Sequence, residues 1–452
     1  MRIRALLILL CWPLWSQAQT ACSGVDSLSI EGNYQTSTRI FYRELNWKPG
    51  ECLVVTDSLL ARFEGRLQST HLFTEVALNI EGSILRIKVK ERWYAWAKPI
   101  AGYGDGSLMN WAQSGYELTR LFGGAEFHLN NIGGLNRDLR LTAVGGFNRA
   151  AGLAFRRPYT HAERDYQWSV QAEHVQSSNL WLMSQNNQVR FYPDAHVQMK
   201  QSTQLGGEFR YRFNYHKDIR VQSTGQWMEV DSNILKLNPN YTLGSARQFQ
   251  QRLGLIWVRD YRNQLHYPTQ GSEWKTSLAL YGQWSGEAQR FTPELESRYR
   301  VFVPLTDHSG LAAMAFVRYR MGELTYVLQN QAFFQGDYVR GYENYMFDGQ
   351  GLALAKLAYR YRLGLPEKLQ WPFKVLGTYR QMPLQAWLNL YTDAGKILNP
   401  IGLATNPLGE NLLHSVGLGV DLLLYYDALL RVDFSRNARG EWVSRLVFRH
   451  AI

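Results

Sequence analysis

The chain has 452 residues, of which 45% are hydrophobic, 13% aromatic and 19% charged, and its formal net charge is +11. Charge is lower and aromatic content higher than in an average soluble domain. Beyond the N-terminus, no apolar run approaches the roughly 18 residues of a transmembrane helix. The basic residues are scattered along the chain, which argues against a patch that binds nucleic acid. A membrane β-barrel fits this composition, because its alternating strands average out in hydropathy.

Residues 1–18 have the pattern of a secretory signal peptide. A basic start precedes an apolar run, and Ser16-Gln17-Ala18 fits a small-x-small cleavage site. We therefore expect export to the envelope of a Gram-negative cell; a lipidated Cys22 and a short buried helix are the alternatives. In that oxidising compartment, Cys22 and Cys52 are candidates for a disulfide, although the sequence alone leaves its geometry open.

Residues 19–92 predict a small α+β domain. Alternating apolar residues indicate strands, helical spacing of apolar residues indicates two helices, and Glu81-Gly82-Ser83 is a hairpin signal between the last two strands. In the predicted order of strand, helix, helix, strand and strand, the elements are about 25–30, 39–46, 57–67, 73–80 and 84–89.

This order and its signature residues resemble a POTRA domain. The residues that carry the resemblance are Gly32, Asn33, Arg43, Glu44, Leu45, Phe73, Val76, Glu91 and Arg92. The resemblance implies binding of unfolded or partner chains by adding a strand at an exposed sheet edge. It also implies accessory periplasmic or lipoprotein subunits as partners of this domain. A domain that only docks another subunit is the alternative.

Residues 93–452 alternate with a period of two, which predicts membrane strands. At roughly 22 residues per strand, this region predicts a mainly β fold with an antiparallel transmembrane β-barrel of about 16 strands. In residues 352–363, the basic side chains share one face and Leu357, Tyr359 and Tyr361 share the other. A basic side chain facing lipid at mid-depth costs about 2–4 kcal/mol, so the basic face should point into the lumen. A soluble β-sandwich would also alternate, but the signal peptide and the aromatic excess favour the barrel.

A long segment, from about 322 to 350, separates two of these alternating stretches. Loops of this length are usually functional or disordered. It contains Val339, Arg340, Gly341 and Tyr342, an arginine between an apolar residue and a glycine. Alternation places Asp393 on the polar face of a later strand, so its carboxylate should face the lumen. A guanidinium and a carboxylate can form two parallel hydrogen bonds.

Three segments together resemble the BamA/TamA-like outer-membrane assembly superfamily, also called the bacterial surface antigen family. They are Val339 to Tyr342, the mid-barrel motif with Asp260, Arg262, Pro268 and Gly271, and the late-strand motif from Tyr391 through Asp393 to Gly395. The resemblance implies that Arg340 reaches into the lumen and pairs with Asp393.

The resemblance also implies a weak seam between the first and last strands, about Tyr94–Tyr103 and Glu441–Ile452. The chain departs from the family at Ala358, where assembly proteins often have a glutamate. The expected salt-bridge network is therefore smaller, and Arg360 is a competitor for Asp393.

No enzyme signature is present: there is no Gly-x-Ser-x-Gly, no His-Glu-x-x-His, no phosphate loop and no metal-ligand spacing of histidines. We therefore expect no catalytic residue, metal or cofactor. The resemblance implies insertion of outer-membrane proteins or translocation of a protein, in the outer membrane with the POTRA domain in the periplasm. Outer-membrane lipids and unfolded outer-membrane or secreted proteins are the implied partners. A two-partner secretion pore, a passive porin and a non-catalytic scaffold are the alternatives.

Overall fold

The computed structural model describes residues 24–45, 53–68, 70–103, 116–157, 166–178, 180–191, 199–214, 216–264, 267–329, 338–343, 345–364, 368–370, 381–424 and 428–450. The expected signal peptide and the expected pairing of Cys22 with Cys52 lie outside these residues. The chain divides into two compact units, Met1–Arg92 and Trp93–Ile452.

The first unit has the predicted order of elements. They are β1 (Ser27–Glu31), α1 (Thr38–Leu45), α2 (Asp57–Gln68), β2 (Phe73–Glu81) and β3 (Ile84–Glu91). The strand order is β1-β3-β2, with β1 parallel and β2 antiparallel to β3. In β3, Leu85 and Ile87 are fully buried, and Phe41 of α1 lies against Phe73 with ring centroids 5.4 Å apart. The helices thus cover one face of the small sheet, as in a POTRA domain.

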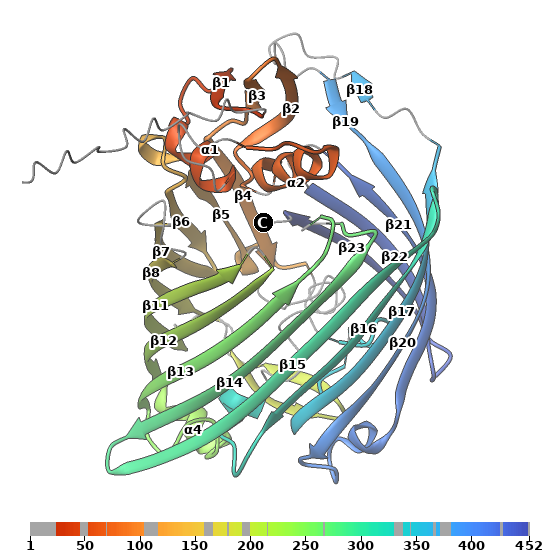
Figure 1. The fold of residues 1–452 in the computed structure, drawn as a ribbon. Coiled ribbons are helices and arrows are strands. Elements are labelled where there is room, and N and C mark those ends of the chain that lie inside the picture. The colour runs from red at the N-terminus through yellow and green to blue at the C-terminus, as the bar shows by residue number, and fades with distance from the viewer. Residues whose placement is uncertain are drawn as a thin grey trace, which may run out of the picture. The chain divides into compact units, whose positions relative to one another are not determined.

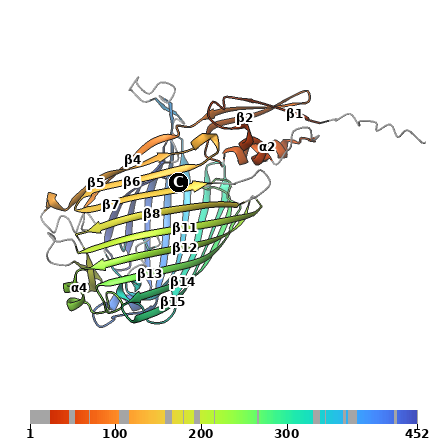
Figure 2. The same ribbon diagram turned by 90° about the vertical axis from the view of Figure 1, so that its left-hand side faces the viewer.

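The second unit is a single 16-stranded sheet in which every pair of neighbours is antiparallel (Figure 1, Figure 2). Its strands are β4 (Ala95–Tyr103), β5 (Leu121–Leu129), β6 (Asp138–Gly146), β7 (Asn148–Arg157), β8 (Tyr166–Ser177), β11 (Lys200–Asn214), β12 (Lys217–Val230), β13 (Arg247–Asp260), β14 (Gly271–Ser285), β15 (Ala288–Thr306), β16 (Ser309–Arg320), β17 (Gly349–Leu363), β20 (Gln385–Pro400), β21 (Leu413–Leu423), β22 (Ala428–Asn437) and β23 (Trp442–His450). The predicted fold class is confirmed.

Short elements lie in the connections between the barrel strands. They are the hairpin β9 (Trp181–Gln185) and β10 (Gln188–Phe191), the hairpin β18 (Lys368–Gln370) and β19 (Gln381–Pro383), α4 (Ser232–Leu237), α5 (Tyr326–Gln329) and the 3₁₀ turns Leu118–Arg120, Ile132–Gly134 and Pro407–Glu410. Helix α5 falls within the segment from about 322 to 350, for which the sequence predicts a long loop. Within the described ranges, no helix is long and apolar enough to span a membrane.

The sheet ends in β4 and β23, and among their described residues no backbone pairing joins the two strands. Strands that keep free edges expose unpaired N–H and C=O groups. Elsewhere the two faces differ as the alternation predicted. In β17, Leu357, Tyr359 and Tyr361 are exposed on the outer face, whereas Leu352 and Leu354 are buried on the inner face.

Candidate functional site inside the barrel

Residues 338–343 and 345–348, here called the inward loop, lie between β16 and β17 in the sequence and inside the barrel in the structure. Val339 and Phe347 are fully buried and pack in one cluster with inward side chains of four strands or their ends. Those partners are Phe316, Leu352, Leu354, Ile397 and Leu413. The apolar contacts hold this loop against the inner wall formed by β16, β17, β20 and β21.

Arg340 and Asp393 form a buried ion pair at the centre of this contact. The Nε of Arg340 donates to Oδ2 of Asp393 at 2.8 Å, and Nη2 donates to Oδ1 at 2.6 Å. The backbone N–H of Arg340 donates to Oδ2 at 3.1 Å. Both carboxylate oxygens are thus engaged by one residue, in the two-pronged geometry that makes such pairs strong and directional. Asp393 is only 1% exposed, so the pair is shielded from water.

A second cation and an aromatic ring complete the surroundings of Asp393. Lys356 lies directly across from it on β17, with Nζ 3.6 Å from Oδ2. The guanidinium carbon of Arg340 lies 3.4 Å from the ring centroid of Tyr391, a cation–π contact. The hydroxyls of Tyr391 and Ser435 are 2.8 Å apart. Asp393 therefore has more positive than negative charge around it, which suits a carboxylate that stays ionised.

Two glycines allow this close approach. Gly341 has φ +87°, a conformation that side chains rarely adopt, and a Cβ there would lie 3.2 Å from the Cβ of Ser435. A Cβ on Gly395 would lie 2.6 Å from Cγ2 of Val339. The motif glycine after Asp393 thus leaves the space in which Val339 sits.

The other side of the inward loop is bonded to the last hairpin of the barrel. Asn437, at the end of β22, donates from Nδ2 to the carbonyl of Gly341 at 2.9 Å. The hydroxyl of Tyr345 donates to Oε1 of Glu441 at 2.7 Å. Burial and, after it, this hydrogen bond raise the pKa of Tyr345. Glu441 immediately precedes β23, so the inward loop contacts the end of the edge strand. The motif around Arg340 did not indicate this contact.

Three connections meet beside the start of β17. Asp348 accepts a hydrogen bond from the hydroxyl of Ser184 in β9, and its carbonyl accepts from the N–H of Ile401 at 3.0 Å. Asn406 accepts from the N–H of Asn187 at 2.8 Å. Burial raises the pKa of Asp348 to about 6. These polar contacts join the inward loop to the β9–β10 hairpin and to the connection between β20 and β21.

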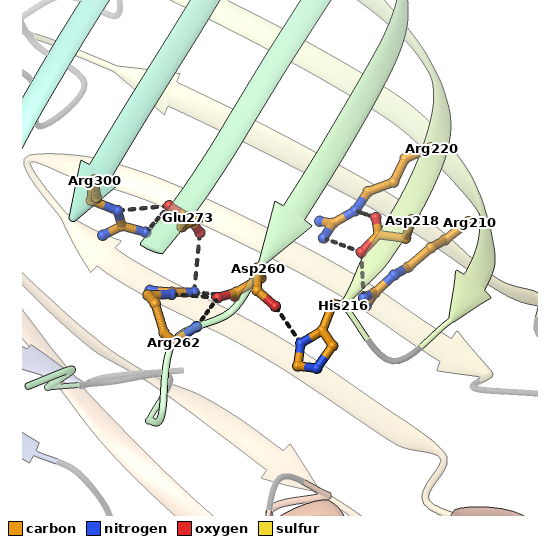
Figure 3. Close-up of polar contacts among 8 residues, drawn as sticks. All are labelled: Arg210, His216, Asp218, Arg220, Asp260, Arg262, Glu273 and Arg300. Atoms are coloured by element: carbon orange, nitrogen blue, oxygen red, sulfur yellow. Dashed lines mark hydrogen bonds and ion pairs between the residues drawn. The ribbon is translucent and has the colours of Figure 1, made fainter. Parts of the chain in front are cut away.

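The mid-barrel motif forms the connection from β13 to β14, here called the Tyr267 turn (residues 261–264 and 267–270). Figure 3 shows the polar contacts at its base: one ion-pair cluster joins β13, β14 and β15, and a separate one joins β11 to β12. Arg262 donates from Nη2 to Oδ2 of Asp260 at 2.6 Å and lies 3.0 Å from Oε1 of Glu273. Arg300 donates from Nε to Oε2 of Glu273 at 2.6 Å. Gly271 has φ +98°, and a Cβ there would collide with the carbonyl of Tyr261.

The tip of this turn reaches across the lumen. Tyr267 is only 4% exposed, and its hydroxyl donates to Oδ2 of Asp421 in β21 at 2.8 Å. Asp421 is also bound by Arg431 of β22, whose Nη2 donates to Oδ2 at 2.6 Å. The carbonyl of Pro268 accepts from Nη1 of Arg360 at 3.2 Å. Tyr267 directly precedes the motif residue Pro268, but nothing in the motif indicated the distant strands that this tyrosine contacts.

Arg360 does not compete for Asp393, contrary to the sequence-based expectation. Its guanidinium carbon lies 4.7 Å from the ring centroid of Tyr267 and 5.5 Å from that of Phe302. The physical reason is register: Arg360 is paired with Asn389, whereas Lys356 is the residue opposite Asp393. Ala358 lies opposite Tyr391 and contributes no charge.

The POTRA-like residues hold the first unit together. Glu91 accepts from the N–H groups of Gln35 at 3.0 Å and Thr36 at 2.6 Å, and Asn33 donates to the carbonyl of Thr36 at 3.1 Å. Gly32 has φ +89°, and a Cβ there would lie 2.0 Å from the carbonyl oxygen of Val89.

The remaining signature residues of this unit are buried or paired. Arg43 donates from Nη2 to Glu44 at 2.8 Å, and Nε of Arg92 donates to the carbonyl of Phe73 at 3.1 Å. Leu45, Phe73 and Val76 are buried. Across both described units, no group of three His, Cys, Asp or Glu side chains is placed to hold a metal ion.

A sixteen-stranded barrel with an anchored inward loop defines a class of outer-membrane protein. The model of the Omp85 superfamily domain matches residues 131–437, more than half of the sequence. The chain belongs to the Omp85 superfamily and is an outer-membrane β-barrel protein. No curated protein gave a significant sequence match.

Solved structures of the same fold agree with this assignment. BamA from Haemophilus ducreyi lacking POTRA domains 1–3 is 13% identical, with a TM-score of 0.54 over 94% of this chain and 83% of that one. CdiB from Acinetobacter baumannii is 13% identical, with a TM-score of 0.53 over 93% and 72%. CdiB from Escherichia coli is 11% identical, with a TM-score of 0.53 over 94% and 74%. At these identities the likeness concerns the fold.

Proposed function

We propose that the protein inserts outer-membrane proteins into the membrane or moves a protein across it, and that the inward loop anchored by Arg340 controls its seam. The observation that carries the proposal is the double attachment of this loop. Arg340 fixes it to Asp393 on β20, while Gly341 and Tyr345 contact the end of β22 and Glu441 beside the edge strand β23. A change in the position of the inward loop would therefore affect the edge strand β23.

The seam supplies a physical driving force. In hydrocarbon, unpaired backbone groups cost several kcal/mol each, so the edges of β4 and β23, whose described residues do not pair with each other, favour pairing with an arriving strand. An unfolded substrate gains hydrogen bonds and membrane burial in the same step. No chemical energy source is then required. The α+β unit would act in the periplasm by accepting substrate or accessory chains at its sheet edges.

Cross-linking at the seam tests this proposal. A photo-reactive residue at Ala97 of β4 or at Leu446 of β23 should capture substrate chains in cells. The matched control is Leu253, which is 51% exposed but lies on β13, a strand that is paired on both sides. Equal capture at all three positions, or none at the seam positions, would exclude insertion through the seam.

A secretion pore for one dedicated substrate is the second candidate, favoured by the fold shared with CdiB. Depletion of the protein separates the two. Loss of many β-barrel proteins from the outer membrane supports insertion, whereas loss of one secreted protein supports the pore. Large stable currents through the purified wild-type protein in planar bilayers would favour a passive porin over both.

A further inference from the structure

Beneath the Tyr267 turn, the inner wall carries a compact patch of side chains from two neighbouring strands. Arg360 of β17 lies directly opposite Asn389 of β20, and Trp387 precedes Asn389 by two residues on the same face. Trp387 is 7% exposed and Asn389 is 3% exposed. The patch consists of these three residues, Arg360, Trp387 and Asn389.

All three residues of the patch hold buried hydrogen-bond donors that the protein does not use. The Nε of Arg360, Nε1 of Trp387 and Nδ2 of Asn389 are buried, and none has a partner in the described structure. A buried donor left unpaired loses its hydration without compensation, and native proteins keep few of them. Three such donors in one patch indicate capacity for a ligand that supplies acceptors.

In this structure the patch is covered by a segment of the chain itself, the Tyr267 turn. The ring of Tyr267 lies 4.7 Å from the guanidinium carbon of Arg360 and 5.4 Å from the ring of Trp387. The carbonyl of Pro268 accepts the single hydrogen bond that Arg360 donates to the turn. An aromatic side chain and a neighbouring backbone carbonyl thus occupy the patch, and they leave three donors unused.

The charges nearby select among ligands. Asp421 lies beside the patch, is paired with Arg431 and accepts from the hydroxyl of Tyr267, so a phenol in this position finds an acceptor. Backbone carbonyls can satisfy the unused donors without bringing a further charge into the lumen. The aromatic face of Trp387 and the face of the Arg360 guanidinium favour a ring over an aliphatic side chain.

We propose that this patch binds an aromatic residue of an unfolded polypeptide, with tyrosine preferred, and that the Tyr267 turn occupies it as an exchangeable internal ligand. The ring of the incoming residue takes the place of Tyr267, its hydroxyl donates to Asp421, and its backbone carbonyls accept from the unused donors. The site rests on the proposed function, because that function supplies polypeptide as the substrate class.

The construction of the turn permits this exchange. Its base is held by ion pairs of Arg262 with Asp260 at the end of β13 and with Glu273 near the start of β14. The side chain of Asn263 closes the turn by accepting from the N–H of Thr269 at 3.1 Å. Among the described residues of the turn, the contacts with the patch come from Tyr267 and Pro268, so these two can leave while the base stays folded.

Peptide binding to the purified full chain in detergent tests the site. The probe is a short labelled unfolded peptide with one tyrosine, compared with the same peptide carrying leucine there, and binding is followed by fluorescence anisotropy. Tyr267→Ala removes the internal competitor. If the open patch is about one-tenth populated in the wild type, the variant should bind the tyrosine peptide about tenfold more tightly.

Three further variants make the result specific. Tyr281→Ala is the matched control, because Tyr281 is also a buried luminal tyrosine (6% exposed) whose hydroxyl is bonded to an arginine, Arg252. It should leave peptide binding unchanged. Trp387→Leu in the Tyr267→Ala background should lose the gain. Tyr267→Phe, which alters one hydroxyl, should give a smaller increase and covers the case in which Tyr267→Ala fails to fold.

The proposal is overturned if Tyr267→Ala binds the peptide like the wild type, if both peptides bind equally, or if Trp387→Leu retains the gain. Failure of the proposed function is a separate result. If seam cross-links at Ala97 and Leu446 are absent while Tyr267→Ala still raises peptide affinity, the luminal site stands and lateral insertion does not. Seam capture without any effect of Tyr267→Ala would support lateral insertion and exclude the luminal site.

Discussion

The inward loop and the Tyr267 turn both reach through the lumen to the wall of late strands, but they are built differently. They enter from opposite ends of the barrel, because two further connections separate them along an antiparallel sheet. At Asp393, Arg340 engages both carboxylate oxygens. Under Tyr267, three buried donors stay unused. A carboxylate whose two oxygens are both bonded by one arginine resists exchange, whereas donors left unpaired can be satisfied by a new partner.

The largest expected effect comes from breaking the ion pair between Arg340 and Asp393. Arg340→Ala leaves Asp393 buried beside Lys356 alone, and removing one member of a buried pair costs about 3–5 kcal/mol. We expect a lower denaturation midpoint, faster proteolysis of the inward loop and loss of activity in cells. Asp393→Ala should behave alike, and Arg340→Lys should be intermediate because lysine lacks the two-pronged geometry.

Arg318→Ala is the control for this prediction. Arg318 pairs with Glu296 inside the barrel, at 2.6 Å between Nη2 and Oε2. Its loss should lower stability without faster cleavage of the inward loop. Full activity of both Arg340→Ala and Asp393→Ala would show that the anchor has no functional role.

A double-mutant cycle tests whether Val339 of the inward loop packs against Gly395. Gly395→Ala places a methyl group within 2.6 Å of Val339 Cγ2 and should cost about 1–3 kcal/mol in the free energy of unfolding. Val339→Ala removes that methyl group, so the double variant should recover much of the loss caused by Gly395→Ala. Additive costs in the cycle would mean that the two positions are not packed against each other.

Weakening the contact between Tyr267 and Asp421 should have a smaller effect on stability. Tyr267→Phe removes one hydrogen bond to a charged group, worth about 1.5–3 kcal/mol at most, and Asp421 keeps its pairing with Arg431. We expect a fall in the denaturation midpoint smaller than that of Arg340→Ala. A loss equal to that of Arg340→Ala would contradict the distinction between a fixed and an exchangeable contact.

The smallest effect concerns Asp348, which joins the inward loop to β9. Its pKa in the folded protein is about 6, above the ordinary value of 3.8. The folded state therefore favours the protonated acid, and this contribution to stability is present below about pH 4 and lost as the pH rises through 6. Asp348→Asn should flatten that part of the curve of unfolding midpoint against pH. An unchanged curve would show that Asp348 does not titrate in this window.

Local sequence patterns were enough for the architecture. Period-two alternation indicated about 16 strands and placed Asp393 and the basic residues of β17 on the inner face, because register and burial of a strand follow directly from its pattern. Glycine and hairpin signals located the elements of the first unit. The motif residues Arg340, Asp260 and Arg262 stood out for the same reason, since each belongs to a short contiguous segment.

Only the tertiary structure showed which residues far apart in the sequence contact each other. Only the register of β17 with β20 placed Lys356 opposite Asp393 and Arg360 opposite Asn389, which overturned the expected competition by Arg360. Curvature of the sheet brought Tyr267 to Asp421, 154 residues away, and Tyr345 to Glu441. A period of two determines which face a side chain occupies. It does not determine which side chain lies across the lumen, because that depends on the shear and closure of the whole barrel.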